Sequence, residues 1–201
     1  MKKTNNKGFS LVELIIVIAI MAILAGAIAP ALIKYIDKSR KSNDISSAKT
    51  IKTAVETALG NESVYEYLTN LDTGKTTSSV LIGAAASSAT VGNIEVTIAD
   101  CTKPDDSALA TDEAEKLIAD NIGDKAPKTK YKKSIDKDGN KVKVASDGFQ
   151  PSQFVAFITK NGTVYVAVCG SDAGTCEVAE DGTLTFTDCA PLAPEVCKGY
   201  Q

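Results

Sequence analysis

One carboxylate, Glu13, is the residue best placed in this chain to do chemistry. The twenty residues that follow it, Leu14 to Ile33, carry no charge. A stretch of about 20 apolar residues is long enough to cross a bilayer. A charge in such a stretch costs roughly 2.5–3.5 kcal/mol on insertion scales. We therefore expect Glu13 to have a positive partner, and the identity of that partner to indicate the function.

The rest of the chain offers little other chemistry. Its 201 residues include no His, which excludes Ser-His-Asp and Cys-His catalysis and His-ligated metal sites. The net charge of −3 gives no general electrostatic case for nucleic-acid binding. Asp136, Asp138 and Asn140 have the composition of a calcium loop, but Gly139 falls two positions too early. We predict a hairpin turn there, no metal, no cofactor, no specific small-molecule ligand and no enzymatic activity.

All five cysteines lie in the distal half of the chain, at Cys101, Cys169, Cys176, Cys189 and Cys197. Behind a membrane-targeting segment, this clustering indicates disulfides in an oxidising compartment. The spacings are too wide for CxxC redox motifs or zinc fingers, and the secreted context disfavours a four-cysteine zinc site. The most local pairing is Cys169–Cys176 with Cys189–Cys197, which leaves Cys101 free. Other pairings stay open.

The N-terminus permits three interpretations. A cleaved secretory signal has a basic start, an apolar region and a small-residue cleavage site such as Ala27–Ala29. Pro30 would hinder cleavage at that site, and the apolar run is longer than such a signal needs. An ordinary single-pass anchor explains the length of the run, but neither Glu13 nor the Gly8-Phe9 junction.

The third interpretation is a resemblance to a known family. The chain contains the string Lys7-Gly8-Phe9-Ser10-Leu11-Val12-Glu13-Leu14-Ile15. This string resembles the class III signal of type IV pilins. The resemblance implies that a prepilin peptidase cuts between Gly8 and Phe9 on the cytoplasmic side, and that the new Phe9 terminus is N-methylated. It also implies a stretch of loosened helix at Gly26 and Pro30, and a C-terminal disulfide loop similar to Cys189–Cys197.

Cleavage after Gly8 would give Glu13 its positive partner. The new α-amine lies on Phe9, four residues before Glu13, which is one helical turn away on the same face. This amine is cationic near neutral pH. The partner can be the same chain's amine or that of a neighbouring subunit, and the second arrangement penalises a slipped register. The alternative is that Glu13 only caps the helix at the membrane interface.

The elements that position Glu13 form one long helix from Phe9 to Leu59. Its second half carries an apolar stripe at spacings of three and four residues, formed by Ile45, Ala48, Ile51, Val55 and Leu59. We predict a cleaved leader at residues 1–8, a transmembrane and assembly half at 9–33, an amphipathic half at 34–60, and a globular pilin head with a Cys-rich C-terminal region at 61–201.

The head pattern predicts an α+β fold, with the long N-terminal helix packed on an antiparallel β-sheet head. Strand patterns cover residues 93–99, 154–160, 163–169 and 184–186, with a two-residue turn at Asn161-Gly162. A short strand pair is expected to flank the turn at residues 137–140, and short helices at 62–71 and 112–121. The segments 102–112 and 190–201 are expected to face outward as partner-binding loops.

The resemblance implies a structural subunit of a type IV pilus that serves adhesion, motility or aggregation. Its partners would be other pilin subunits in a homopolymer, the inner membrane before assembly, the prepilin peptidase and the assembly machinery. The precursor would be a single-pass cytoplasmic-membrane protein with an extracytoplasmic head, and the product an extracellular pilus. The alternative function is a pseudopilin of type II secretion or a competence pilin for DNA uptake.

Overall fold

The computed structural model describes residues 10–84, 94–101, 108–123, 126–143, 147–171 and 174–201. The chain divides into two units, Met1–Ser39 and Arg40–Gln201. Helix α1 (Leu11–Ala58) contributes residues to both of them. We call Arg40–Gln201 the head unit and describe each unit by itself.

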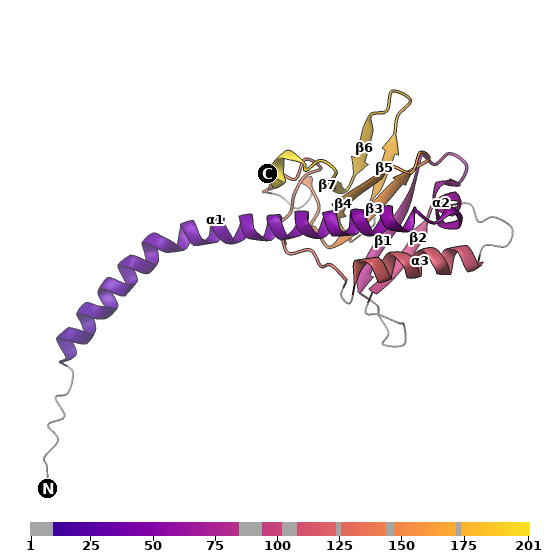
Figure 1. The fold of residues 1–201 in the computed structure, drawn as a ribbon. Coiled ribbons are helices and arrows are strands. Elements are labelled where there is room, and N and C mark those ends of the chain that lie inside the picture. The colour runs from indigo at the N-terminus through magenta and orange to yellow at the C-terminus, as the bar shows by residue number, and fades with distance from the viewer. Residues whose placement is uncertain (1–9, 85–93, 102–107, 124–125, 144–146, 172–173) are drawn as a thin grey trace, which may run out of the picture. The chain divides into compact units, whose positions relative to one another are not determined.

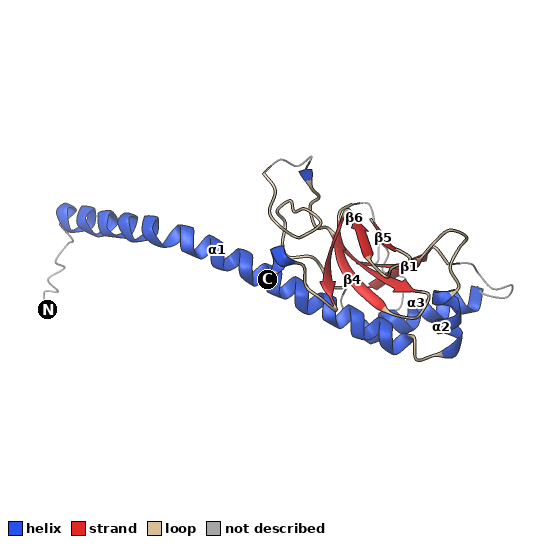
Figure 2. Ribbon diagram, turned by 90° about the horizontal axis from the view of Figure 1, so that it is seen from above, coloured by secondary structure: helices blue, strands red, loops and turns tan. Residues whose placement is uncertain are grey.

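The head unit contains a five-stranded antiparallel sheet in the order β2-β1-β3-β4-β7, and a separate β5–β6 hairpin that projects from it (Figure 1). Its elements are α2 (Glu62–Thr69), β1 (Thr77–Ala84), β2 (Ile94–Ala99), α3 (Ala108–Ile122), β3 (Gln153–Thr159), β4 (Val164–Cys169), β5 (Thr175–Val178), β6 (Leu184–Thr187), β7 (Cys189–Ala193) and the 3-10 helix η2 (Lys198–Tyr200). The helices α2 and α3 and the second half of α1 lie on one side of the sheet (Figure 2). The predicted α+β fold is confirmed.

The two faces of strand β3 explain how the head unit is packed. Phe154 and Ile158 lie in the same buried cluster as Ile51 of α1, so this face of the sheet receives the long helix. Val155 and Phe157 point to the opposite face, as the period of two in a strand requires, and join a second buried cluster. Strand β3 is therefore buried on both faces, under α1 on one side and near the β5–β6 hairpin on the other.

The sequence located the second half of α1 accurately. Ala48, Ile51 and Val55 are fully buried, while the ends of the predicted stripe, Ile45 and Leu59, are partly buried against the same core. The four strand patterns correspond to β2, β3, β4 and β6. Strands β1, β5 and β7 were not predicted, because β1 lies in an ambiguous Ala- and Ser-rich region and β5 and β7 are only four and five residues long.

Two turns differ from their predicted form. The β3–β4 turn is one residue longer than predicted, because Thr159 N donates to Thr163 O at 3.0 Å and Gly162 takes φ +75°. The Asp136 turn is closed by the Asp136 carboxylate, which accepts Asp138 N at 3.0 Å and Asn140 N at 2.8 Å. The flanks pair through an isolated antiparallel bridge, Ile135–Lys141, and the backbone bonds from Asp136 N to Asn140 O at 2.9 Å and from Val142 N to Ser134 O at 3.1 Å, so the pairing found in the described residues is shorter than the predicted strand pair. The described residues contain no metal-binding group of three or more acidic, Cys or His side chains.

The two segments expected to be outward loops contain helix and strand residues instead. The first falls partly on residues 102–107, which lie outside the described residues, and partly on α3, which begins at Ala108. The second contains β7, where Ala190 and Leu192 are fully buried, and Tyr200, which is 3% exposed. Strand pairing and core packing use these C-terminal residues, so the second loop prediction is wrong.

Candidate assembly site

Glu13 lies in the first turn of α1 and caps it. The backbone N–H of Ser10 donates to Glu13 Oε2 at 3.0 Å. A glutamate at this position in Ser-x-x-Glu reaches back to an N–H that the helix itself leaves unsatisfied. The carboxylate is also favoured there by the positive end of the helix dipole. Gly8 and Phe9 lie outside the described residues, so the predicted cleavage site and amine partner stay predictions.

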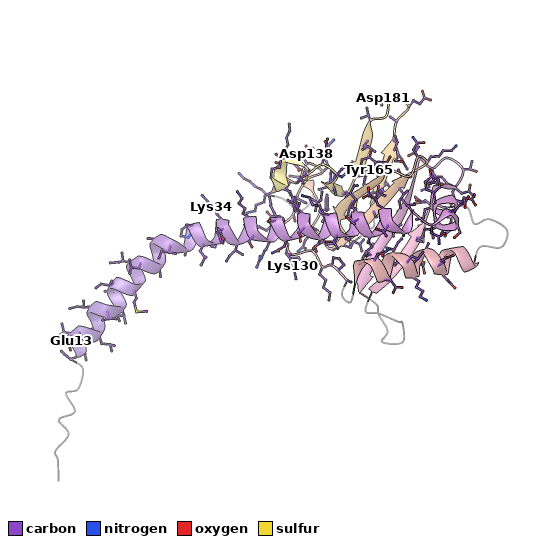
Figure 3. All side chains as sticks on the ribbon, in the orientation of Figure 1. Glu13, Lys34, Lys130, Asp138, Tyr165 and Asp181 are labelled. Carbon is purple, nitrogen blue, oxygen red and sulfur yellow. A yellow bond between two sulfur atoms is a disulfide. The ribbon has the colours of Figure 1, made fainter. Side chains whose placement is uncertain are left out.

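The apolar half of α1 presents its side chains to the surroundings in every direction (Figure 3). Large apolar residues from Leu11 to Ile36 are exposed, with Leu11 and Ile23 each at 73%. By length and composition, α1 can cross a membrane. Such a surface has to be covered, by lipid or by other protein, because contiguous apolar area in water is unfavourable.

Gly26 and Pro30 lie inside this exposed stretch, and α1 is helical through both of them. A Cβ built on Gly26 would meet nothing within 4 Å, so no close contact explains the glycine. Pro30 cannot donate the usual backbone bond to the carbonyl of Gly26, which weakens the helix at this point. The role of these two residues in loosening the helix stays a prediction.

Asp44 is the residue of α1 that sequence reasoning missed. Its side chain is fully buried, and it accepts the backbone N–H of Lys130 at 2.6 Å and of Tyr131 at 3.0 Å. Burial raises the pKa of Asp44, while the two N–H donors act in the opposite direction. The position gave a signal, because Asp44 precedes Ala48 by four residues on the apolar face. A carboxylate there requires a buried donor.

One turn earlier, Lys41 holds the C-terminal segment. Its Nζ donates to the carbonyl of Gly199 and lies 4.8 Å and 5.3 Å from the ring centroids of Tyr131 and Tyr200. These are cation–π distances. Lys41 and Asp44 together fasten α1 to two segments that are distant in sequence.

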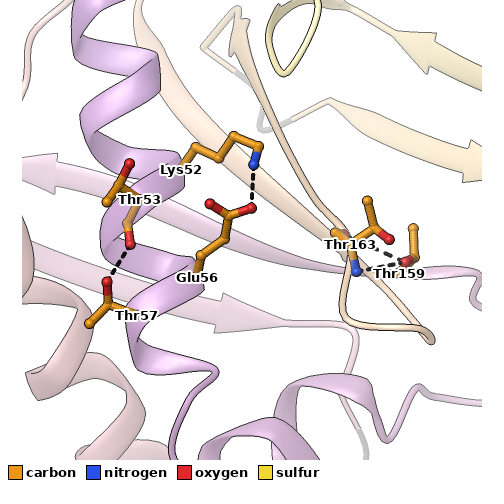
Figure 4. Close-up of polar contacts among 6 residues, drawn as sticks. All are labelled: Lys52, Thr53, Glu56, Thr57, Thr159 and Thr163. Carbon is orange, nitrogen blue, oxygen red and sulfur yellow. Dashed lines mark hydrogen bonds and ion pairs between the residues drawn. The ribbon is translucent and has the colours of Figure 1, made fainter.

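The other face of α1 is polar within the head unit (Figure 4). Lys52 forms an ion pair with Glu56 one turn later, and Thr57 Oγ1 donates to the Thr53 carbonyl at 2.7 Å. Both contacts are local to the helix and exposed, so they add little to stability. The helix is thus amphipathic here, as predicted.

The structure pairs Cys169 with Cys189, so the predicted pairing is wrong. Strands β4 and β7 are neighbours in the sheet, and their register places Cys169 directly opposite Cys189. The local pairs, Cys169–Cys176 and Cys189–Cys197, minimised sequence separation and took no account of strand pairing. The disulfide spans 20 residues, a segment that contains the whole β5–β6 hairpin.

The other three cysteines are free thiols. Cys176 is 3% exposed, and its burial raises its pKa to about 12. Burial also raises the pKa of Cys101 and of Cys197 to about 11. All three are therefore protonated near neutral pH and are poor nucleophiles and poor metal ligands.

Comparison with known proteins identifies the family. The family model of the prokaryotic N-terminal methylation motif matches residues 3–29. The chain is 44% identical over 57 residues to the type IV major fimbrial protein FimA of Dichelobacter nodosus, which covers 28% of this chain and 36% of that relative. The chain thus spans little more than a third of the length of this relative. No solved structure matches the chain.

Two further relatives are matched over more of their length. Fimbrial protein Q of Moraxella bovis is 36% identical over 115 residues, which cover 50% of this chain and 73% of that protein. Prepilin peptidase-dependent protein A of Clostridium perfringens is 27% identical over 103 residues, which cover 51% of this chain and 74% of that protein. With the methylation motif at the start of an exposed apolar helix and an α+β head, the chain belongs to the type IV pilin family and carries a prepilin processing signal.

Proposed function

We propose that this chain is a filament-forming subunit of a type IV pilus, which serves adhesion, motility or aggregation. The observation that carries the proposal is the apolar half of α1, whose large side chains are all exposed, with a single carboxylate, Glu13, at its start. In a filament, the same helix that anchors the precursor in lipid packs against the helices of other subunits. The matched relatives named as fimbrial proteins support this function.

Maturation begins in the cytoplasmic membrane. A prepilin peptidase removes the leader, residues 1–8, by cleavage between Gly8 and Phe9, and Phe9 is N-methylated. The apolar half, residues 9–33, spans the membrane with the leader on the cytoplasmic side. The amphipathic half, residues 34–60, and the head at 61–201 lie outside. A relative named for its dependence on prepilin peptidase supports the processing step.

Cleavage changes the partner of Glu13. In the structure, Glu13 Oε2 accepts a hydrogen bond from the backbone N–H of Ser10, three residues earlier in the same chain. The free amine of Phe9 offers a cation within the same helical turn, or from a neighbouring subunit in the filament. A subunit that enters out of register leaves one of these charges unpaired in an apolar setting, which is strongly unfavourable. Gly26 and Pro30 allow the helix to loosen as it packs.

This role is structural and not catalytic, and the relatives named as fimbrial proteins favour a pilus over the secretion or competence alternative. The partners are other copies of the chain, the inner membrane before assembly, the peptidase and the assembly machinery.

The test combines processing with assembly in cells that make the full chain. Mass spectrometry of surface filaments is expected to find a mature N-terminus at methylated Phe9. Glu13→Gln is expected to insert in the membrane and to be processed, yet to form at least tenfold fewer filaments by electron microscopy, because the carboxylate charge is lost. The control, Glu66→Gln, changes an exposed carboxylate on α2. A mature terminus other than Phe9, or normal filaments from Glu13→Gln, contradicts the proposal.

A further inference from the structure

Charge is divided between two segments of the head unit. Residues 161–197 contain no Lys or Arg but six acidic residues. Residues 126–143 contain seven lysines and two aspartates. Figure 3 shows Asp181 at the tip of the β5–β6 hairpin and Lys130 on the opposite side of the head, while Asp138, near the other end of the lysine-rich segment, lies on the same side as Asp181. One copy of the chain therefore presents a negative surface at the hairpin and a positive surface around Lys130 that face different ways.

The negative surface is a pre-organised hairpin, residues 174–188, which we call the acidic hairpin. Glu177, Glu180, Asp181 and Asp188 are all exposed on it. The disulfide Cys169–Cys189 closes the chain at its base. At the tip, Thr183 N donates to Asp181 Oδ1 at 2.9 Å, which lowers the pKa of Asp181 and keeps it ionised.

Side chains of the neighbouring segment also fix the hairpin to the sheet. Thr77 Oγ1 donates to the Cys176 carbonyl at 2.6 Å, and Val178 N donates to Thr76 Oγ1 at 3.0 Å. These bonds satisfy backbone groups of β5, the Cys176 carbonyl and the Val178 N–H, on the side that faces residues 76–77. A surface that is already ordered loses little conformational entropy on binding, which favours its use as a contact.

A groove of about 380 Å³ lies between the hairpin and the C-terminal segment. Its apolar walls come from Tyr165, Leu184, Phe186, Pro191, Pro194 and Val196. Among the described residues that line the groove, exposed Glu195 is the only charged one. Lysine suits such a groove, because its aliphatic stem packs on apolar walls and on aromatic rings while its ammonium group reaches a carboxylate.

The positive surface is also held in place. We call residues 126–143 the basic segment. The buried Asp44 carboxylate fixes its backbone at residues 130 and 131, and Thr129 Oγ1 donates to the Pro151 carbonyl at 3.2 Å. Six of the seven lysines of this segment are exposed, namely Lys128, Lys130, Lys132, Lys137, Lys141 and Lys143.

We propose that the acidic hairpin of one copy docks on the basic segment of a second copy, with lysine stems in the apolar groove. This inference rests on the proposed function, because it names the head surfaces that meet in the filament. The contact joins two different patches, so the first copy keeps its basic segment free and the second copy keeps its acidic hairpin free. Such head-to-tail contacts build open helical filaments wherever the rotation between copies does not close a ring.

The test is a charge swap in cells that assemble wild-type filaments from the full chain. Glu180→Lys/Asp181→Lys is expected to lower the surface filaments per cell about tenfold, since exposed attractions become repulsions. Lys128→Glu/Lys130→Glu, at two exposed lysines of the basic segment, is expected to give a similar loss. The four substitutions combined are expected to restore filaments. The control, Glu66→Lys/Asp120→Lys, makes the same change in net charge at exposed helix positions. Immunoblots of membranes check that every variant accumulates to the wild-type level.

Three outcomes would overturn this inference, and a fourth would contradict the proposed function. Normal filaments from the hairpin variant overturn this inference while the pilus function stands. Loss without restoration in the combined variant also overturns it, because the two surfaces then do not meet. An equal loss in the control assigns the effect to net charge and overturns it as well. A wild-type chain that forms no filament at all contradicts the proposed function instead.

Discussion

The disulfide Cys169–Cys189 makes a prediction whose magnitude follows from the topology. Replacing both cysteines by Ala releases a loop of 20 residues in the unfolded chain. In the chain-entropy model, closing a loop of that length stabilises the folded state by about 3 kcal/mol. The two sulfurs are also fully buried, so the truncated side chains add a packing cost. We therefore expect a free energy of unfolding at least ~3 kcal/mol lower than that of the wild type.

The assay is urea unfolding of the full chain in detergent, followed by the fluorescence of its six tyrosines, since the chain has no Trp. The control, Cys101→Ala/Cys197→Ala, removes two half-buried thiols that form no disulfide. We expect this control to lose much less than the disulfide variant. Adding reductant to the wild type should reproduce most of the loss without any change in packing.

Peptide mapping tests the connectivity itself. Trypsin cannot separate the four distal cysteines, because residues 161–197 contain no Lys or Arg. Cleavage after glutamate, at Glu177 and Glu195, places Cys169 and Cys189 in different fragments, with Cys197 in a third. A bridge between the first two fragments supports the reasoning. A bridge inside the fragment that holds both Cys169 and Cys176, or a stability loss below ~1 kcal/mol, refutes it.

Four further predictions concern α1 and the C-terminal segment. Asp44→Ala leaves the buried N–H of Tyr131 and the partly buried N–H of Lys130 without their acceptor, and we expect urea unfolding to show a loss of roughly 2–4 kcal/mol. The folded pKa of Asp44 is raised above 3.8, so the native state binds more protons just above that pH. Stability from this group therefore falls as pH rises through that window, and Asp44→Asn is expected to remove this fall in a pH series of unfolding curves. Gly199→Ala puts a Cβ 1.9 Å from the Gly139 carbonyl carbon, and a large drop in the urea midpoint is expected. Gly26→Ala meets no atom within 4 Å, so its head is expected to unfold at the wild-type midpoint.

Local patterns in the sequence predicted the elements that depend on local rules. The apolar run and the stripe from Ala48 to Val55 predicted α1 and its buried face, because helical periodicity is a property of neighbouring residues. Alternation predicted β3 and β4, and the Asn161-Gly162 turn located their connection. The short strands β5 and β7 were missed, since four or five residues carry too little pattern to identify a strand.

Local sequence patterns do not predict contacts between segments that are distant in the sequence. The bond from Asp44 to the backbone of Lys130 joins residues 86 apart in sequence, and no local pattern encodes it. The partner of Cys169 depends on the neighbouring position of β4 and β7, and thus on the order of the whole sheet.

The motif and the hydrophobic run are written in consecutive residues, so the sequence was enough to predict the family, the apolar helix and the position of Glu13. Which cysteines pair, what holds the second half of α1 in the head unit, and that the acidic hairpin and Lys130 lie on different sides all depend on the tertiary structure. These features arise when strand pairing and core packing bring distant residues together or hold them apart. Sequence separation measures neither.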